Sequence, residues 1–147
     1  MTSALPLGPG RVALVLALAL LLPSPVAPQS PHAAALGFAE AWASGDTDQL
    51  RGWFAGSVRL TLDNQTRTGV RPDQTVAALG VLLDRFQGPA PVVVRAEPMG
   101  PDGESGFAEL RWEARFRDSG TPRTHTFLLT FVRIGENLRI SDLRVVA

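Results

Sequence analysis

Two side chains in the last quarter of the chain are of the types that carry out acid–base chemistry. His125 stands near the start of the run "RTHTFLL", where an imidazole could act as a general base or proton shuttle near neutral pH. Asp142 stands between Ile140 and Leu143, where a bulge could turn its carboxylate into a pocket. Each also has a simpler interpretation. His125 could close a strand at the rim of a sheet, and Asp142 could bond its own backbone or pair with an arginine across the strands.

The residue types that are missing limit the chemistry further. The chain has no Cys, which excludes disulfides, thiolate nucleophiles and thiolate metal sites. It also has no Tyr, and its second histidine, His32, lies close to the N-terminal end. No other histidine stands at metal-ligand spacing from His125, so we expect no metal site. We also expect no cofactor, and we assign no residue a catalytic role.

Charge and composition indicate a folded domain without a nucleic-acid partner. The 147 residues are 45% hydrophobic, and fourteen basic residues balance fourteen acidic ones. All fourteen basic residues are arginine. Two explanations are open: a codon bias towards arginine, or a use for the guanidinium in binding anions through two parallel hydrogen bonds.

The first 28 residues have the pattern of a secretory signal peptide. Arg11 precedes an apolar run of eleven residues, and prolines follow it. The run is shorter than the roughly 20 residues that span a bilayer. We therefore expect residues 1–28 to be a signal peptide and residues 29–147 to be one exported domain, periplasmic or secreted, with no stable membrane anchor after cleavage. An uncleaved tether is the alternative.

Helical spacing predicts three helices in the first half of this domain. The first spans residues 32–44 and ends at Gly45. A second, shorter helix is capped by Asp46 and should end at Gly56. A third begins at Pro72, and its apolar stripe includes Leu83.

Alternating apolar and polar residues predict strands. One follows Gly56, a short one is expected around residues 66–70, and four more fill residues 91–146. In the strand around Trp112, the indole should face inward and Arg111 and Glu113 outward. The last strand changes phase, which predicts a β-bulge near Ser141 and Asp142. Short turns favour a curved antiparallel sheet of three or four strands.

The stretch "FAEAWASGDTDQLRGWFAGSVRLTL" resembles the beginning of the nuclear transport factor 2-like superfamily. A helix ending in a Gly-Asp pair, a short helix and an alternating strand are typical of it, and "FLLTFVRIGENLRISDLRVV" resembles its last hairpin. The closest resemblance is to an exported bacterial branch catalogued as a domain of unknown function. The resemblance implies an α+β cone, in which three helices from the N-terminal half pack on the concave face of a curved antiparallel sheet.

One fold supports many functions, so the resemblance leaves the function open. We expect a non-catalytic exported domain that binds a small apolar ligand or a protein partner. The alternatives are a small enzyme of isomerase, dehydratase or cyclase type that uses Asp142 and His125, and a structural accessory domain of an envelope complex. The candidate pocket residues are Trp42, Phe54, Leu83, Trp112, His125 and Asp142.

A homodimer is expected from the strand "THTFLLTFVRI". Phe127, Leu129 and Phe131 point to one face, whereas Leu128, Val132 and Ile134 point to the other. A strand that is apolar on both faces needs cover on both. A second copy of the chain, packed on the outer face, would provide that cover.

Overall fold

The computed structural model describes residues 28–147, so the signal-peptide prediction lies almost entirely outside the described residues. Three helices and seven strands follow one another along this part of the chain. In chain order they are α2 (Pro31–Ser44), α3 (Thr47–Arg51), β1 (Phe54–Leu62), β2 (Gln65–Val70), α4 (Pro72–Arg85), β3 (Phe86–Gln87), β4 (Val92–Met99), β5 (Ser105–Phe116), β6 (Pro122–Ile134) and β7 (Asn137–Val146). None of the described helices is long and apolar enough to cross a membrane.

Helix α2 forms as its sequence predicts. The Ser30 hydroxyl accepts a hydrogen bond from the amide of Ala33 at 3.1 Å and caps the first turn. Gly45 ends the helix in the left-handed conformation, with φ of 70°, which glycine adopts without steric cost. The stripe formed by Phe38 and Trp42 is fully buried, so α2 is held mainly by its packing on the sheet.

Helix α3 begins where expected but ends earlier. The Asp46 carboxylate accepts a hydrogen bond from the amide of Asp48 at 2.9 Å and caps the helix. The helix stops at Arg51, and Gly56 lies inside β1. The expected end at Gly56 was wrong because Phe54 already pairs with Ile140 of β7, and the Ile140 amide donates to the Trp53 carbonyl at 2.8 Å. Pairing with a distant strand overrides the local helical pattern.

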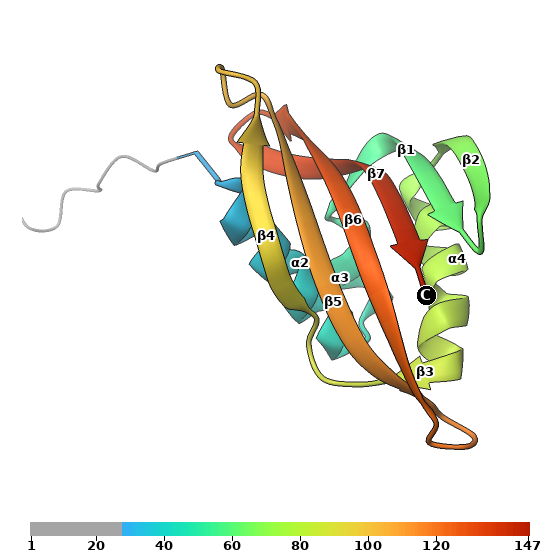
Figure 1. The fold of residues 1–147 in the computed structure, drawn as a ribbon. Coiled ribbons are helices and arrows are strands. Elements are labelled where there is room, and N and C mark those ends of the chain that lie inside the picture. Colours follow the sequence, from blue (N-terminus) through green and yellow to red (C-terminus); the bar gives the residue numbers. More distant parts are fainter. Residues whose placement is uncertain (1–27) are drawn as a thin grey trace, which may run out of the picture.

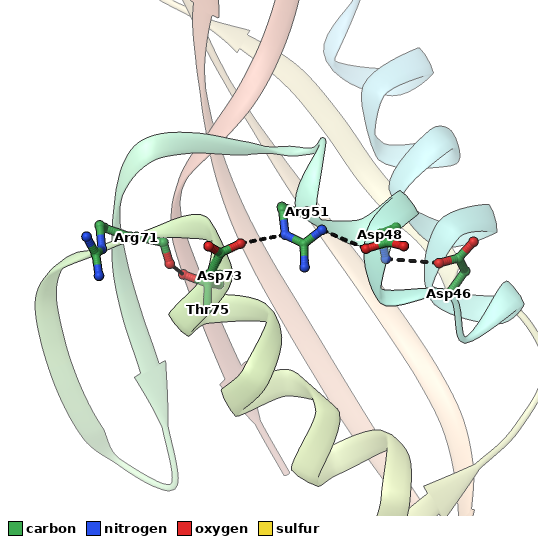
Figure 2. A network of polar contacts seen from close by, with 6 residues as sticks. All are labelled: Asp46, Asp48, Arg51, Arg71, Asp73 and Thr75. Atoms are coloured by element: carbon green, nitrogen blue, oxygen red, sulfur yellow. Dashed lines mark hydrogen bonds and ion pairs between the residues drawn. The ribbon is translucent and has the colours of Figure 1, made fainter.

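Arg51 connects α3 with the start of α4 (Figure 2). Its guanidinium lies 2.6 Å from a carboxylate oxygen of Asp48 and 2.6 Å from one of Asp73. Thr75 then donates its hydroxyl to the Arg71 carbonyl at 3.0 Å, which closes the first turn of α4. All three charged side chains are exposed, so these contacts set the orientation of the two helices more than they stabilise the fold.

The sheet has more strands than the sequence pattern predicts. Seven strands pair in the order β2-β1-β7-β6-β5-β3, and β4 also pairs with β5. All pairs are antiparallel except β1 with β7, which is parallel. The expected size of three or four strands was too small, because the pairing of β1 with the last strand, which joins β1 and β2 to the sheet, has no local signal in the sequence.

The bulge in β7 is confirmed. Ile140 pairs with Phe131, whereas Asp142 pairs with Thr130, so Ser141 is the extra residue. The bulge restores Leu143 and Val145 to the face that carries Ile140, and all three side chains are buried.

The core lies between the concave face of the sheet and the helices, which cover this one face (Figure 1). Trp42 of α2 packs against Trp112 of β5 and Phe127 of β6, with ring centroids 5.2 and 4.9 Å apart. Trp112 is 1% exposed, while Arg111 and Glu113 lie outside, as the alternation predicts. The structure is thus an α+β fold with a curved sheet around an aromatic core.

Candidate functional site

A cavity of about 320 Å³ opens at the end of the core where α4, the β1–β2 turn, the start of β6 and the end of β7 meet. The C-terminal end of the chain lies beside α4 in Figure 1, and it forms part of the cavity wall. The surface of the cavity is about equally polar and apolar, and the apolar lining residues are Leu62, Ala78, Val81, Leu82, Phe86, Val145, Val146 and Ala147. The polar lining residues are Asp63, Asn64, Arg85, Arg123 and His125.

His125 lines this cavity from the concave face of β6. It pairs with Trp112 across the strands and packs against Phe86, with ring centroids 5.4 and 4.6 Å away. The residue is only 3% exposed, and its Nδ1 atom has no hydrogen-bond partner in the described part of the chain. A buried polar atom without a partner is costly, so this imidazole has unused capacity to bind a polar group.

The surroundings of His125 keep its side chain neutral. Burial lowers the pKa of His125 below its usual value, and the positive charges of Arg123 and Arg85 lower that pKa further. A polar contact between the His125 side chain and the Arg123 backbone opposes this shift, as does, more weakly, the carboxylate of Asp63. The imidazole is therefore uncharged at neutral pH and can donate or accept one hydrogen bond at each ring nitrogen, according to its tautomer.

Two guanidinium groups stand beside this imidazole. Arg85, in the last turn of α4, lies 5.4 Å from the centre of the Phe86 ring, and Arg123 lies 6.0 Å from the centre of the Phe116 ring. The two phenyl rings are themselves 4.5 Å apart. Neither arginine forms an ion pair with another residue of the 28–147 region. Phe86 and Phe116 thus lie near two guanidinium groups that form no ion pair within residues 28–147.

A second, wider cavity of about 700 Å³ continues from the first between α4 and β2. The two share Leu62, Asp63, Ala78 and Val81. Val81 is 58% exposed although it is apolar, and it stands where the two cavities meet. Together they form one groove along α4, and His125 lines its smaller part.

Asp142 does not lie in this groove. It faces the opposite side of the sheet, in a polar depression that it shares with Arg59, Thr130 and Arg144. The structure therefore does not bring Asp142 and His125 together, although their strands are neighbours.

The other candidate residues are placed differently. Trp42, Phe54 and Trp112 belong to the packed core and line none of the cavities described above. Trp112 uses its indole N–H to donate to the Pro89 carbonyl at 3.0 Å. Leu83 is half-buried against the core and also lines none of the three. Of the six candidates, His125 alone lines the cavity at the end of the core.

Sequence reasoning missed the two arginines and Phe86. One signal was present: Arg123 stands two residues before His125 on the same strand, so both side chains belong to one face. Arg85 gave no comparable signal, because only the folded chain brings the last turn of α4 to the start of β6.

No known protein family and no curated protein matches this sequence. Solved structures do match the fold. A DUF4783 family protein from Bacteroides ovatus superposes with a TM-score of 0.61 at 15% identity, over 74% of this chain and 90% of that one. A ketosteroid isomerase-like protein from Erwinia carotovora atroseptica gives a TM-score of 0.66 at 12% identity, over 79% and 92%.

A protein of unknown function from Shewanella oneidensis, described as NTF-2 like, gives a TM-score of 0.57 at 19% identity, over 76% of this chain and 92% of that one. These identities are too low to carry function across, but the superpositions cover most of each chain. The chain therefore has the nuclear transport factor 2-like fold.

Proposed function

We propose that this protein is an exported, non-catalytic domain that binds a small, largely apolar molecule in the cavity beside His125. The observation that carries the proposal is the cavity itself: apolar side chains of α4 and β7 line part of its wall, and a nearly buried imidazole with no Nδ1 partner within residues 28–147 lies against it. Small-molecule sites combine such apolar walls with a few polar groups that fix the orientation of the ligand. The volume of about 320 Å³ suits a small molecule.

The exposed apolar rim also supports this function. Val81 and Val146 line the cavity and are 58% and 39% exposed. A ligand that covers them would remove apolar surface from water, which favours binding.

Blocking the entrance tests this proposal. Val81→Trp places a large ring over the opening, and Val94→Trp, at a similarly exposed valine of β4 outside the cavities described above, is the matched control. Native mass spectrometry of protein isolated from its own host should show a retained small molecule in the wild type and in Val94→Trp but not in Val81→Trp. Equal retention in all three proteins would place the ligand elsewhere, and its absence from the wild type would contradict the proposal.

The observed geometry does not support the enzyme alternative as the sequence suggested it. That alternative needed His125 and Asp142 in one cavity, and they lie on opposite faces of the sheet. His125 can still hydrogen-bond a ligand in the cavity, but Asp142 is not there to assist it.

We also propose that the protein forms a homodimer through the outer face of the sheet. Leu128 and Val132 are half-buried on this face, and Ile134 is 54% exposed. The helices of residues 28–147 all lie on the other face of the sheet (Figure 1). Charged residues lie close to this face: Arg95 of β4 and Glu109 of β5 form an ion pair at 3.3 Å. A two-fold interface would therefore need complementary charges at its rim. Light scattering at micromolar concentration tests this directly: a stable monomer would contradict it.

Export is the remaining part of the proposal. It rests on the signal-peptide pattern of residues 1–28. Sequencing the N-terminus of protein collected outside the cytoplasm of a producing cell should show cleavage within or shortly after this segment. An intact Met1 on cytoplasmic protein would contradict export.

A further inference from the structure

We propose that the ligand of this cavity is a monocarboxylate, held by Arg85 and Arg123 through its charged group while its apolar part lies along the wall formed by α4 and β7. This inference names the chemical class of the ligand and rests on the proposed function.

The two arginines are placed to hold an anion. Each guanidinium lies near the ring of a phenylalanine, and the two rings pack against one another at 4.5 Å, so both cations are held over one aromatic base. A guanidinium that stacks through its face keeps its N–H groups, which lie in its plane, free for hydrogen bonds. Neither group is neutralised within residues 28–147, as the ion pairs of this region involve other arginines.

The buried imidazole adds an independent indication. His125 is 3% exposed, its Nδ1 atom is without a hydrogen-bond partner, and the residue lines the same cavity as both arginines. Arg85 and Arg123 are close enough to His125 for their charges to act on its titration. A carboxylate bound beside the two arginines would be attracted by their positive charges and would lie next to the uncharged imidazole of His125.

A carboxylate in the cavity wall limits the charge of the ligand to one. Asp63 lies in the β1–β2 turn and lines the cavity. A second negative charge on the ligand would face the Asp63 carboxylate. The apolar part of the wall, along α4 and β7, cannot replace the hydration of a second charged group on the ligand. A planar carboxylate, in contrast, fits the two parallel N–H groups of a guanidinium.

The test uses octanoate and octanamide, which differ in charge but hardly in size. Binding to the mature protein is measured by NMR titration at low ionic strength, where an exposed guanidinium is screened least. Octanoate should bind about tenfold or more tightly than octanamide, the size of effect that a charge-assisted hydrogen bond produces. Arg85→Gln and Arg123→Gln should each weaken octanoate binding by about tenfold and leave octanamide binding unchanged. Arg144→Gln, on the outer face, is the matched control and should change neither.

The outcomes separate this inference from the function on which it rests. Equal affinity for octanoate and octanamide, with both bound at the cavity, would overturn the carboxylate inference and leave the apolar site intact. A charge preference that Arg144→Gln reduces as much as Arg85→Gln does would also overturn it, because the effect would then come from net charge. Failure of both probes to bind at the cavity would count against the site as well as the ligand class.

Discussion

His125 and Asp142 lie on adjacent strands but on opposite faces of the sheet. His125 faces the core and the cavity at its end, whereas Asp142 faces the polar depression on the outer surface. The bulge at Ser141 determines this, since it shifts the register after Ile140 and leaves Asp142 opposite the outward-facing Thr130. The enzyme alternative required Asp142 beside the imidazole, and the two side chains are instead separated by the thickness of the sheet.

The first prediction concerns this separation. Asp142→Asn should leave octanoate affinity unchanged, because the Asp142 carboxylate lies outside the groove. His125→Phe should weaken octanoate binding, because it removes the buried imidazole from the cavity. NMR titration of both variants measures the difference. A loss of affinity in Asp142→Asn equal to that in His125→Phe would mean that the two residues act in one site after all.

The second prediction is that His125→Phe stabilises the fold at the expense of binding. The phenyl ring fills much the same space among Phe86 and Trp112 and removes a buried nitrogen that has no partner. We expect a gain of about 1 kcal/mol in the free energy of unfolding, the usual cost of one unsatisfied buried group. Urea denaturation at pH 7.5 measures it, and a loss of stability would show that Nδ1 has a partner, such as an ordered water.

The third prediction is a pH dependence of stability that His125 causes. The pKa of His125 is lower in the folded protein than in the unfolded chain, so below the unfolded value of about 6.5 the unfolded chain binds the extra proton first. Stability should therefore be highest above about pH 6.5 and should fall as the pH is lowered from there towards the folded-state pKa.

Denaturation midpoints between pH 7.5 and 5 measure this effect, with His125→Phe as the variant that should lose it. His32→Gln is the control, since His32 is exposed at the start of α2. The same slope in wild type and His125→Phe would assign the dependence to other groups.

The fourth prediction compares two neighbours on β5. Trp112→Ala should reduce the free energy of unfolding by about 3–5 kcal/mol, because it leaves a large cavity in the core and frees the Pro89 carbonyl. Arg111→Ala should change it by no more than about 0.5 kcal/mol, since its ion pair with Glu113 is exposed at 3.4 Å. Comparable losses in a urea titration would contradict the strand register.

The fifth prediction compares two glycines in helices. A Cβ atom at Gly37 of α2 would overlap the indole of Trp53, whereas a Cβ atom at Gly80 of α4 would meet nothing within 4 Å. Gly80→Ala should therefore stabilise the protein by about 0.5–1 kcal/mol through helix propensity, and Gly37→Ala should destabilise it by about 1–2 kcal/mol as the indole is displaced. Equal gains from both substitutions in thermal unfolding would show that Trp53 does not rest on Gly37.

Local patterns predicted most of the fold. The Gly-Asp pair at Gly45 and Asp46, the inward position of Trp112 and the phase change at Ser141 each follow from spacing within a few residues, and the structure confirms all three. The end of α3 and the parallel pairing of β1 with β7 were missed, because both depend on a strand more than 80 residues further along the chain.

The candidate site was less predictable for a similar reason. His125 was found because its residue type is informative by itself. Arg85 was not, since a basic residue in the last turn of a helix is ordinarily explained by the helix dipole. Only the folded chain gives Arg85, at the end of α4, and Arg123, near the start of β6, a shared cavity.

The most direct measurement is methyl-detected NMR of the protein titrated with octanoate. A ligand in the cavity beside His125 should shift the methyl signals of Leu62, Val81 and Val145, which line it, and leave that of Val94, which does not, unchanged. Octanoate bound in the cavity should give saturable shifts that are confined to the methyl signals of these lining residues and are lost in Val81→Trp. Uniform small shifts, or saturable shifts centred on the outer face around Leu128, would contradict it.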